Sequence, residues 1–431
     1  MRAWWIGVML VTTSFALACR RKATPSNPPV ASASSPSASV SAAPALPPLR
    51  LERFLDAHAL PSGLVRIAAV ARDASVVLAT VDAKLETRSV DVLVREFTAD
   101  PATTEIVLVG DDLVVAVGKL TNVRAPWLLR KGLPPKALPA DWCRTANGVA
   151  YVVRDPSAAI VRFSDKDGEK SAEPIVVPLE AEVHLACGPG SAVLYVPDGP
   201  RLQAARVFPG KATALVELEK DGDLEAELRD RQVLVRDDAS MLLLRLAEAS
   251  LAVREIKGSE PGKWVSLTDD KGKPFALDPD ADLLAATAAK EGPAFLLVSS
   301  PMKGACASGD PPRRIVLHTL AKDSPKVESR PIVELPCGVD AIPAKLTLDG
   351  PVARLSWTEP LGACSPVQVG LSVGAVVVAS SDKPGARRAD MAAEAIVRVD
   401  DTRFLGVVRP GGCVGYEAPG NGALQWAPLA K

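Results

Sequence analysis

The chain has 431 residues, 48% of them hydrophobic, so it is long enough for a core larger than that of one small domain. Its 50 lysines and arginines against 51 aspartates and glutamates leave a net charge of −1. Four of these cations and no acid fall in the first 48 residues, so the rest of the chain (46 cations, 51 acids) carries −5. This balance leaves no basic stripe, and we expect no nucleic-acid partner.

The first 22 residues have the pattern of an export signal. Arg2 gives a short positive start, and an apolar stretch then runs to Ala18. That stretch is shorter than the about 20 residues with which a helix crosses a bilayer, and small residues end it, as in secretory signals. Residues 16–19 (Ala-Leu-Ala-Cys) resemble the lipobox of bacterial lipoproteins, although Ala16 stands where that family more often has leucine. The resemblance implies a signal peptide over residues 1–18 and a Cys19 that is acylated and anchors the protein to a membrane.

Two alternatives to the lipoprotein signal stay open: an ordinary cleaved signal with an incidental Cys19, or an uncleaved anchor. Arg20 and Arg21, rather than an acid, follow the cysteine. This favours forwarding to the outer membrane in a two-membrane bacterium. We therefore expect a lipid-anchored protein of the cell envelope that faces the periplasm or the surface.

The segment after the cysteine is a linker by composition. Alanine, serine and proline, seven of each, fill 21 of the 26 positions from 23 to 48. Such a segment lacks the large apolar residues that could offset the entropy of ordering it. We expect a disordered linker over residues 19–48 and a folded body over residues 49–431.

The body is predicted to be rich in short strands. Apolar spacing at Leu51–Leu60 favours one amphipathic helix, and helical spacing recurs at Leu283–Lys290 and Arg387–Ala395. Otherwise short runs rich in valine, leucine and isoleucine, bounded by glycine, aspartate and proline, indicate strands. The clearest are Leu64–Val70, Val76–Val81, Val90–Val94, Ile106–Val109, Leu113–Val117, Val149–Val153, Ile160–Phe163, Ile175–Val177, Val193–Val196, Ala205–Phe208, Met241–Leu246, Leu251–Ile256, Phe295–Val298, Ile315–Leu320, Ala353–Trp357, Val367–Val369, Ala375–Val378, Ile396–Val399 and Leu405–Val408.

This density of strands predicts an all-β fold, and it excludes a doubly wound α/β sheet because helices do not follow the strands. At about 40–55 residues per blade, the body has room for seven to nine blades of a β-propeller, and we expect about seven. No repeated tryptophan or glycine signature marks the blades. Two β-sandwich domains, divided near residues 258–292, are the alternative.

Six cysteines remain after Cys19, and an even number in an exported protein favours disulfides. We expect neighbouring cysteines to pair, since each bond would then join a local unit. Zinc is disfavoured because no two cysteines have C-x-x-C spacing and the chain has three histidines. The expected pairs are Cys143–Cys187, Cys306–Cys337 and Cys364–Cys413.

Three short motifs match the sequence pattern of a functional site but lack the neighbouring residues or secondary structure that such a site requires. Residues 370–374 match the G-x-S-x-G of α/β-hydrolases, but a strand pattern follows where a helix is required. Residues 300–303 and 380–383 match S-x-x-K without the companion motifs. Residues 278–282 begin like a calcium loop, but Leu283 and Ala289 occupy the places of its glycine and glutamate.

We therefore expect no catalytic residue, metal or cofactor. The functional hypothesis is an envelope lipoprotein that serves as a non-catalytic platform for a protein partner. One alternative is a small-ligand-binding protein or hydrolase with a site in the propeller channel. Another is a structural envelope protein.

Overall fold

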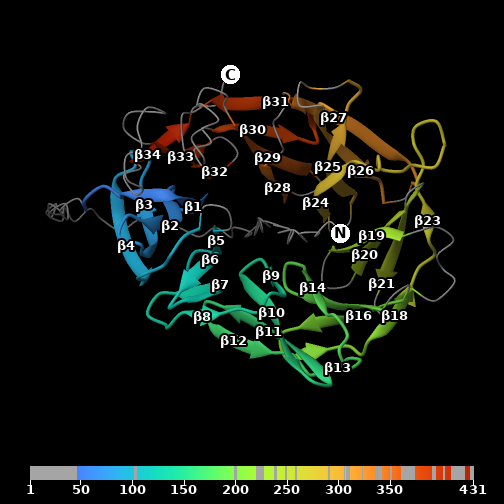
Figure 1. Cartoon of the computed structure of the whole chain (residues 1–431), viewed down its shortest axis with the longest axis horizontal. Helices are drawn as coiled ribbons and strands as arrows, with labels where there is room; N and C mark the ends of the chain where they lie inside the picture. The colour runs from blue at the N-terminus through green and yellow to red at the C-terminus, as the bar shows by residue number, and fades with distance from the viewer. Residues whose placement is uncertain are drawn as a thin grey trace, which may run out of the picture.

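Eight small antiparallel sheets follow one another along the chain and stand in a ring (Figure 1). The computed structural model describes residues 46–427, apart from 101–103, 199–200, 220–227, 237–239, 248–249, 258–259, 290–291, 305, 307–310, 323, 336, 338–341, 350–351, 361–373, 391–394, 401–402 and 409–422. Each sheet is a blade, and the fold is an all-β propeller. The alternative of two β-sandwiches is wrong, because the eight sheets follow one another in chain order around one ring.

The first four blades run from residue 51 to residue 219. Blade 1 contains β1 (Leu51–Ala59), β2 (Val65–Ala71), β3 (Val76–Val81) and β4 (Thr87–Val94). Blade 2 contains β5 (Glu105–Val109), β6 (Leu113–Leu120), β7 (Val123–Arg130) and β8 (Lys136–Ala137). Blade 3 contains β9 (Trp142–Arg144), β10 (Gly148–Asp155), β11 (Ala158–Asp165), β12 (Gly168–Ser171) and β13 (Ile175–Val176). Blade 4 contains β14 (His184–Cys187), β15 (Ala192–Asp198), β16 (Arg201–Phe208), β17 (Lys211–Ala212) and β18 (Val216–Glu219).

The last four blades complete the ring. Blade 5 contains β19 (Leu228–Val235), β20 (Ser240–Ala247), β21 (Ser250–Lys257), β22 (Glu260–Pro261) and β23 (Val265–Ser266). Blade 6 contains β24 (Asp282–Ala288), β25 (Ala294–Pro301), β26 (Arg313–Leu320) and β27 (Val327–Leu335). Blade 7 contains β28 (Ile342–Asp349), β29 (Val352–Pro360), β30 (Gly374–Ser380) and β31 (Lys383–Asp390). Blade 8 contains β32 (Ala395–Arg398), β33 (Phe404–Val408) and β34 (Ala423–Ala427).

The eight blades lie within the expected range of seven to nine, one above the preferred number. The first strand of each blade is innermost, and the second to fourth strands step outward in sequence order; the fifth strands β13, β18 and β23 pair with the third strand of their blade. Because the strands alternate in direction, the turns fall on two faces of the ring. We call the face with the first-to-second and third-to-fourth turns the hairpin face. The opposite face, with the second-to-third turns and the connections between blades, is the crossover face.

Both sides of most blades are buried, since apolar side chains fill the space between neighbours. One cluster, for example, joins Val70 and Leu78 of blade 1 to Leu108 and Val114 of blade 2. Similar clusters join blades 3 and 4 and blades 5 and 6. Burying these surfaces is the main force that holds the ring together.

The three expected helices are wrong, because strands stand in their place: β1, β24 (as far as Ala288) and β31 (as far as Asp390), while residues 290 and 391–394 lie outside the described residues. In β1, Leu51 and Leu55 are four residues apart, a spacing that serves one face of a helix and one face of a strand equally. In β24 both faces are buried from Ala285 onward, and Ala285 and Ala286 lie in different clusters, so polar and apolar residues do not alternate along the strand. Among the described residues, no helix is long and apolar enough to span a membrane.

The ring closes by packing of blade 8 on blade 1. Leu405 and Val407 share a core cluster with Ile67 and Val77. The backbone N–H of Ala59 donates to the carbonyl of Val399 at 3.3 Å. In the described part of the chain, no strand of one of these blades pairs with a strand of the other, so the closure relies on side-chain packing.

Two of the three expected cysteine pairs are confirmed at bonding distance. Cys143 and Cys187 join the innermost strands of blades 3 and 4, with Cα atoms 5.7 Å apart. Cys306 and Cys337 lie in the connections of blade 6, with Cα atoms 5.5 Å apart. Cys364, Cys413 and the expected lipidation residue Cys19 lie outside the described residues.

Candidate functional site

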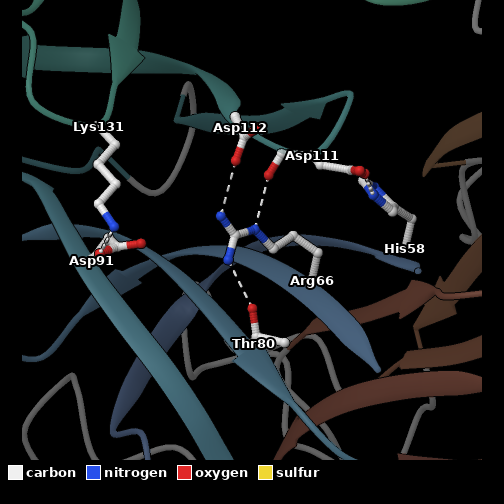
Figure 2. A network of polar contacts seen from close by, with 7 residues as sticks. All are labelled: His58, Arg66, Thr80, Asp91, Asp111, Asp112 and Lys131. Carbon is white, nitrogen blue, oxygen red and sulfur yellow. Dashed lines mark hydrogen bonds and ion pairs between the residues drawn. The ribbon is translucent and has the colours of Figure 1, made fainter. Parts of the chain in front are cut away.

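A polar network connects blades 1 and 2 on the hairpin face (Figure 2). Arg66 of β2 donates through Nε to the carbonyl of Asp111 at 2.8 Å and through Nη1 to Thr80 Oγ1 at 2.7 Å. Its Nη2 donates to Asp112 Oδ1 at 3.2 Å, and His58 Nε2 lies 2.8 Å from Asp111 Oδ1. The two aspartates lie in the hairpin turn between β5 and β6. All three guanidinium nitrogens of Arg66 are used, so this network fastens the two blades.

A second network connects blades 2 and 3. Lys136 of β8 contacts both the Tyr151 hydroxyl and Glu169 of β12, and Arg162 donates to the other carboxylate oxygen of Glu169 at 3.1 Å. Burial alone would raise the pKa of Glu169, but the hydrogen bonds from Lys136 and Tyr151 hold that pKa below its usual value. Burial and the bond to Glu169 raise the pKa of Tyr151. Lys136 and Arg162 both pair with Glu169, so this cluster joins blade 2 to blade 3.

The connection from blade 3 to blade 4 differs from these two polar networks, because it presents apolar side chains to solvent. Residues 176–184 leave the outer edge of blade 3, pass over the crossover face and enter β14; we call them the blade 3–4 crossover. Val176 is 79% exposed and Leu179 is 72% exposed, more than any other large hydrophobic side chain in the described part of the chain. Glu180 and Glu182 are exposed beside them. The result is an apolar surface with an acidic border.

The crossover is held firmly despite this exposure. Val177 and Val183 are buried in the core between blades 3 and 4. The N–H of Val177 donates to the Ser157 carbonyl at 3.3 Å, and Arg154 Nη1 donates to the Ala181 carbonyl at 2.6 Å. Buried anchors therefore alternate with exposed side chains, and the exposed ones have a fixed place on the surface.

Glu180 itself has a φ of 62°, the left-handed region that side chains other than glycine adopt at an energetic cost. This backbone conformation turns the segment sharply between Leu179 and Ala181, where the carbonyl of Pro178 accepts a hydrogen bond from the N–H of Ala181 at 3.2 Å. The turn keeps Leu179 at its outer corner.

A histidine flanked by carboxylates marks the inner end of the crossover. His184 Nε2 lies 3.5 Å from Glu182 Oε1, and its Nδ1 lies 3.9 Å from Asp141 Oδ1. The ring also packs on Tyr195, with ring centroids 5.2 Å apart. Burial raises the pKa of Asp141, while His184 acts in the opposite direction. The two carboxylates approach different ring nitrogens, so they cannot hold one metal ion together with His184.

This cluster does not form a catalytic set. The nearest cysteine along β14, Cys187, is bonded to Cys143 and supplies no thiolate. In the described ranges, no group of three His, Cys, Asp or Glu side chains could hold a metal ion. The arrangement is suited to ion pairing with a ligand at the border of the crossover surface.

The short motifs have no catalytic geometry where the structure describes them. Gly374 begins β30, which pairs with β29 and β31, so a strand and not a helix follows the G-x-S-x-G motif; residues 370–373 lie outside the described residues. Ser300 lies in β25, and residues 380–383 form the turn between β30 and β31. At the calcium-like segment, Arg313 donates to Asp282 Oδ2 at 2.7 Å and to the Asp280 carbonyl at 3.0 Å, where a cation would need free oxygens.

A groove of about 850 Å³ lies where the connection after blade 5 meets blade 6. Its wall includes Asp269, Asp270, Lys322, Lys326 and Glu328. Behind the groove, His318 is buried with its Nδ1 2.9 Å from Ser329 Oγ, a residue of the wall. The groove has the volume of a small-molecule site, but its charged groups, which come from turns and from β27, carry both signs.

No family model matches the chain, and no curated protein matches it. Similar solved structures include the WD40 domain of SCAP from fission yeast, with 10% identity and a TM-score of 0.36 over 89% of this chain and 97% of that chain. A mutant of AofleA from Arthrobotrys oligospora has 10% identity and a TM-score of 0.31 over 66% of this chain and 88% of that chain. A prolyl endopeptidase has 14% identity and a TM-score of 0.38 over 72% of this chain and 48% of that chain. Such low identities and TM-scores indicate nothing about function.

Sequence reasoning did not find the crossover surface. The sequence predicts a strand over Ile175–Val177 and marks nothing at Pro178 or Leu179, and apolar residues such as valine and leucine are usually buried. The one signal in the sequence is the row of acids around them, Glu173, Glu180 and Glu182, with no lysine or arginine between.

Proposed function

We propose that this protein is an envelope lipoprotein, anchored through Cys19, whose propeller is a non-catalytic platform for binding another protein. The observation that carries the proposal is the blade 3–4 crossover, which keeps Val176 and Leu179 exposed while its own backbone is fixed. Fixed apolar side chains reduce the entropy that ordering costs upon association. An interface core needs such apolar groups with a polar rim around them.

The polar networks between blades support the same proposal, because their side chains have a structural role. The Arg66 and Glu169 networks are occupied with joining blades, and neither leaves a reactive group over a cavity. We expect the export signal and linker to hold the ring outside the cytoplasm and away from the lipid surface. A tether of this kind lets a binding surface meet partners that are attached elsewhere in the envelope.

Crosslinked affinity capture from the native envelope tests the platform function. We expect one protein to be recovered with the wild-type chain in a near one-to-one ratio. Recovery that is no different from that of an unrelated lipoprotein with the same signal and linker would contradict the proposal.

Binding of a small zwitterionic ligand is a second candidate, favoured by the groove near Lys326 and Asp270. Side chains of both signs in one groove can pair with an ammonium and a carboxylate of the same molecule. Thermal-shift measurements with free amino acids and dipeptides test this function. Stabilisation that is lost in Lys326→Ala would support it, and no shift with any of these compounds would remove it.

A further inference from the structure

We propose that the blade 3–4 crossover is the docking surface for a protein segment that carries a large apolar side chain flanked by lysine or arginine. This inference rests on the proposed platform function and names the chemistry of the partner. It combines the exposed side chains, the sign of the charges around them and the way the segment is held.

The apolar anchor follows from the exposure of Val176 and Leu179. Two aliphatic side chains that are three-quarters exposed, three residues apart, gain free energy when another apolar surface covers them. Such side chains also occur singly on surfaces without meaning, so the charges around them decide the identity of the occupant.

Acids dominate the border of this surface. From Glu173 to His184 there are three glutamates and no lysine or arginine, and Asp141 adds a carboxylate at the inner end. Arg154 donates to the Ala181 carbonyl of the crossover, and its positive charge also acts on Asp141. The four carboxylates outnumber Arg154, so lysine or arginine on a partner would meet a net negative charge, which speeds association and fixes orientation.

The same charges argue against two other classes of partner. Phosphates of a nucleic acid and headgroups of an anionic lipid surface would be repelled by Glu180, Glu182 and Asp141. An acidic protein segment would be repelled as well. A basic, partly apolar protein segment is the class that satisfies both the apolar centre and the acidic border.

Photocrosslinking at a single position tests the inference directly. A photoreactive amino acid replaces Leu179 in the full-length protein expressed in its own envelope. Leu133, which is 50% exposed on the turn between β7 and β8 on the hairpin face, is the matched control. Both positions are exposed, so neither replacement affects the core.

We expect the Leu179 position, and not the Leu133 position, to crosslink to one partner protein. The crosslinked peptide should contain a large apolar residue with lysine or arginine on both sides. Glu180→Gln combined with Glu182→Gln should lower the crosslinking yield by roughly tenfold at low ionic strength, and by less at high salt. The thermal unfolding midpoint of that variant should stay close to that of the wild type.

The outcomes separate this inference from the platform function. If capture recovers a partner but Leu179 gives no more crosslink than Leu133, the docking surface lies elsewhere and the platform function stands. A crosslinked peptide that is acidic, or a crosslink to lipid or nucleic acid, overturns the partner chemistry. If capture and both crosslinking positions give nothing, the platform function itself fails.

Discussion

Cys143 and Cys187 join the innermost strands of two neighbouring blades, and Cys187 is three residues beyond His184, where the crossover enters β14. The disulfide therefore holds together the two blades that the crossover connects. In a ring whose described strands do not pair across the closure, such a bond prevents one pair of blades from separating. The two cysteines also pack against the buried cluster that contains Val177 and Val183 of the crossover.

The double change Cys143→Ser and Cys187→Ser should destabilise the ring. The bond spans 44 residues, and losing a link of this length costs about 2–4 kcal/mol. Denaturant unfolding under oxidising conditions measures the loss. Peptide mapping without reductant should find the Cys143–Cys187 and Cys306–Cys337 peptides, and free thiols at these four positions would contradict both pairings.

Arg66→Lys should weaken the joint between blades 1 and 2. The guanidinium serves three acceptors at once and is 12% exposed, and an ammonium cannot reach all three. Leaving partly buried acceptors unpaired costs about 1–3 kcal/mol. Arg124→Lys, at an exposed ion pair, is the control and should change the unfolding free energy little. Equal effects of the two changes would show that the network does not fasten the blades.

Acid should destabilise the protein through His318. Burial, with a smaller contribution from Arg314, lowers the pKa of His318 to about 4, below the 6.5 of an ordinary histidine. The unfolded chain therefore binds this proton first, so the contribution of His318 to stability is complete above pH 6.5 and decreases as the pH falls toward 4. The loss amounts to about 3 kcal/mol.

His318→Phe should remove this part of the pH dependence, since phenylalanine does not titrate and can keep the edge contact with Phe275. Unfolding free energies at pH 7, 5.5 and 4.5 provide the comparison with the wild type. An unchanged slope in the variant would show that other groups cause the acid sensitivity.

Cys19→Ala should release the protein from the membrane fraction into the soluble part of the envelope. Acyl chains contribute about 0.8 kcal/mol per buried methylene to membrane binding, and nothing replaces them in the variant. Ser26→Ala, in the same segment, should remain with the membrane. Retention of the Cys19→Ala protein would rule out the lipid anchor.

The strands could be predicted from the sequence, and their assembly only in outline. Val76–Val81 was predicted with its bounds, because a short β-branched run between turn residues leaves little choice. The number of blades could not be fixed, since the sheets hold three, four or five strands and no signature repeats. β1 was mistaken for a helix, because Leu51 and Leu55 satisfy both periods.

The candidate site was hidden for a different reason. Val176 and Val177 are identical residues side by side, yet one is exposed and the other buried. That difference depends on where the outer edge of blade 3 ends and how the crossover turns over its neighbour. Cys143 and Cys187, by contrast, could be paired from their order in the chain, because consecutive blades are neighbours in a propeller.

Native mass measurement of the full-length protein, released from its own envelope by mild detergent, tests the platform function most directly. The expected result is a complex whose mass equals the mature chain plus one copy of a second protein, dissociating as the ionic strength rises. A species with the mass of the chain alone, or of several copies of it, at every detergent and salt concentration would contradict the proposal that this propeller is a platform for another protein.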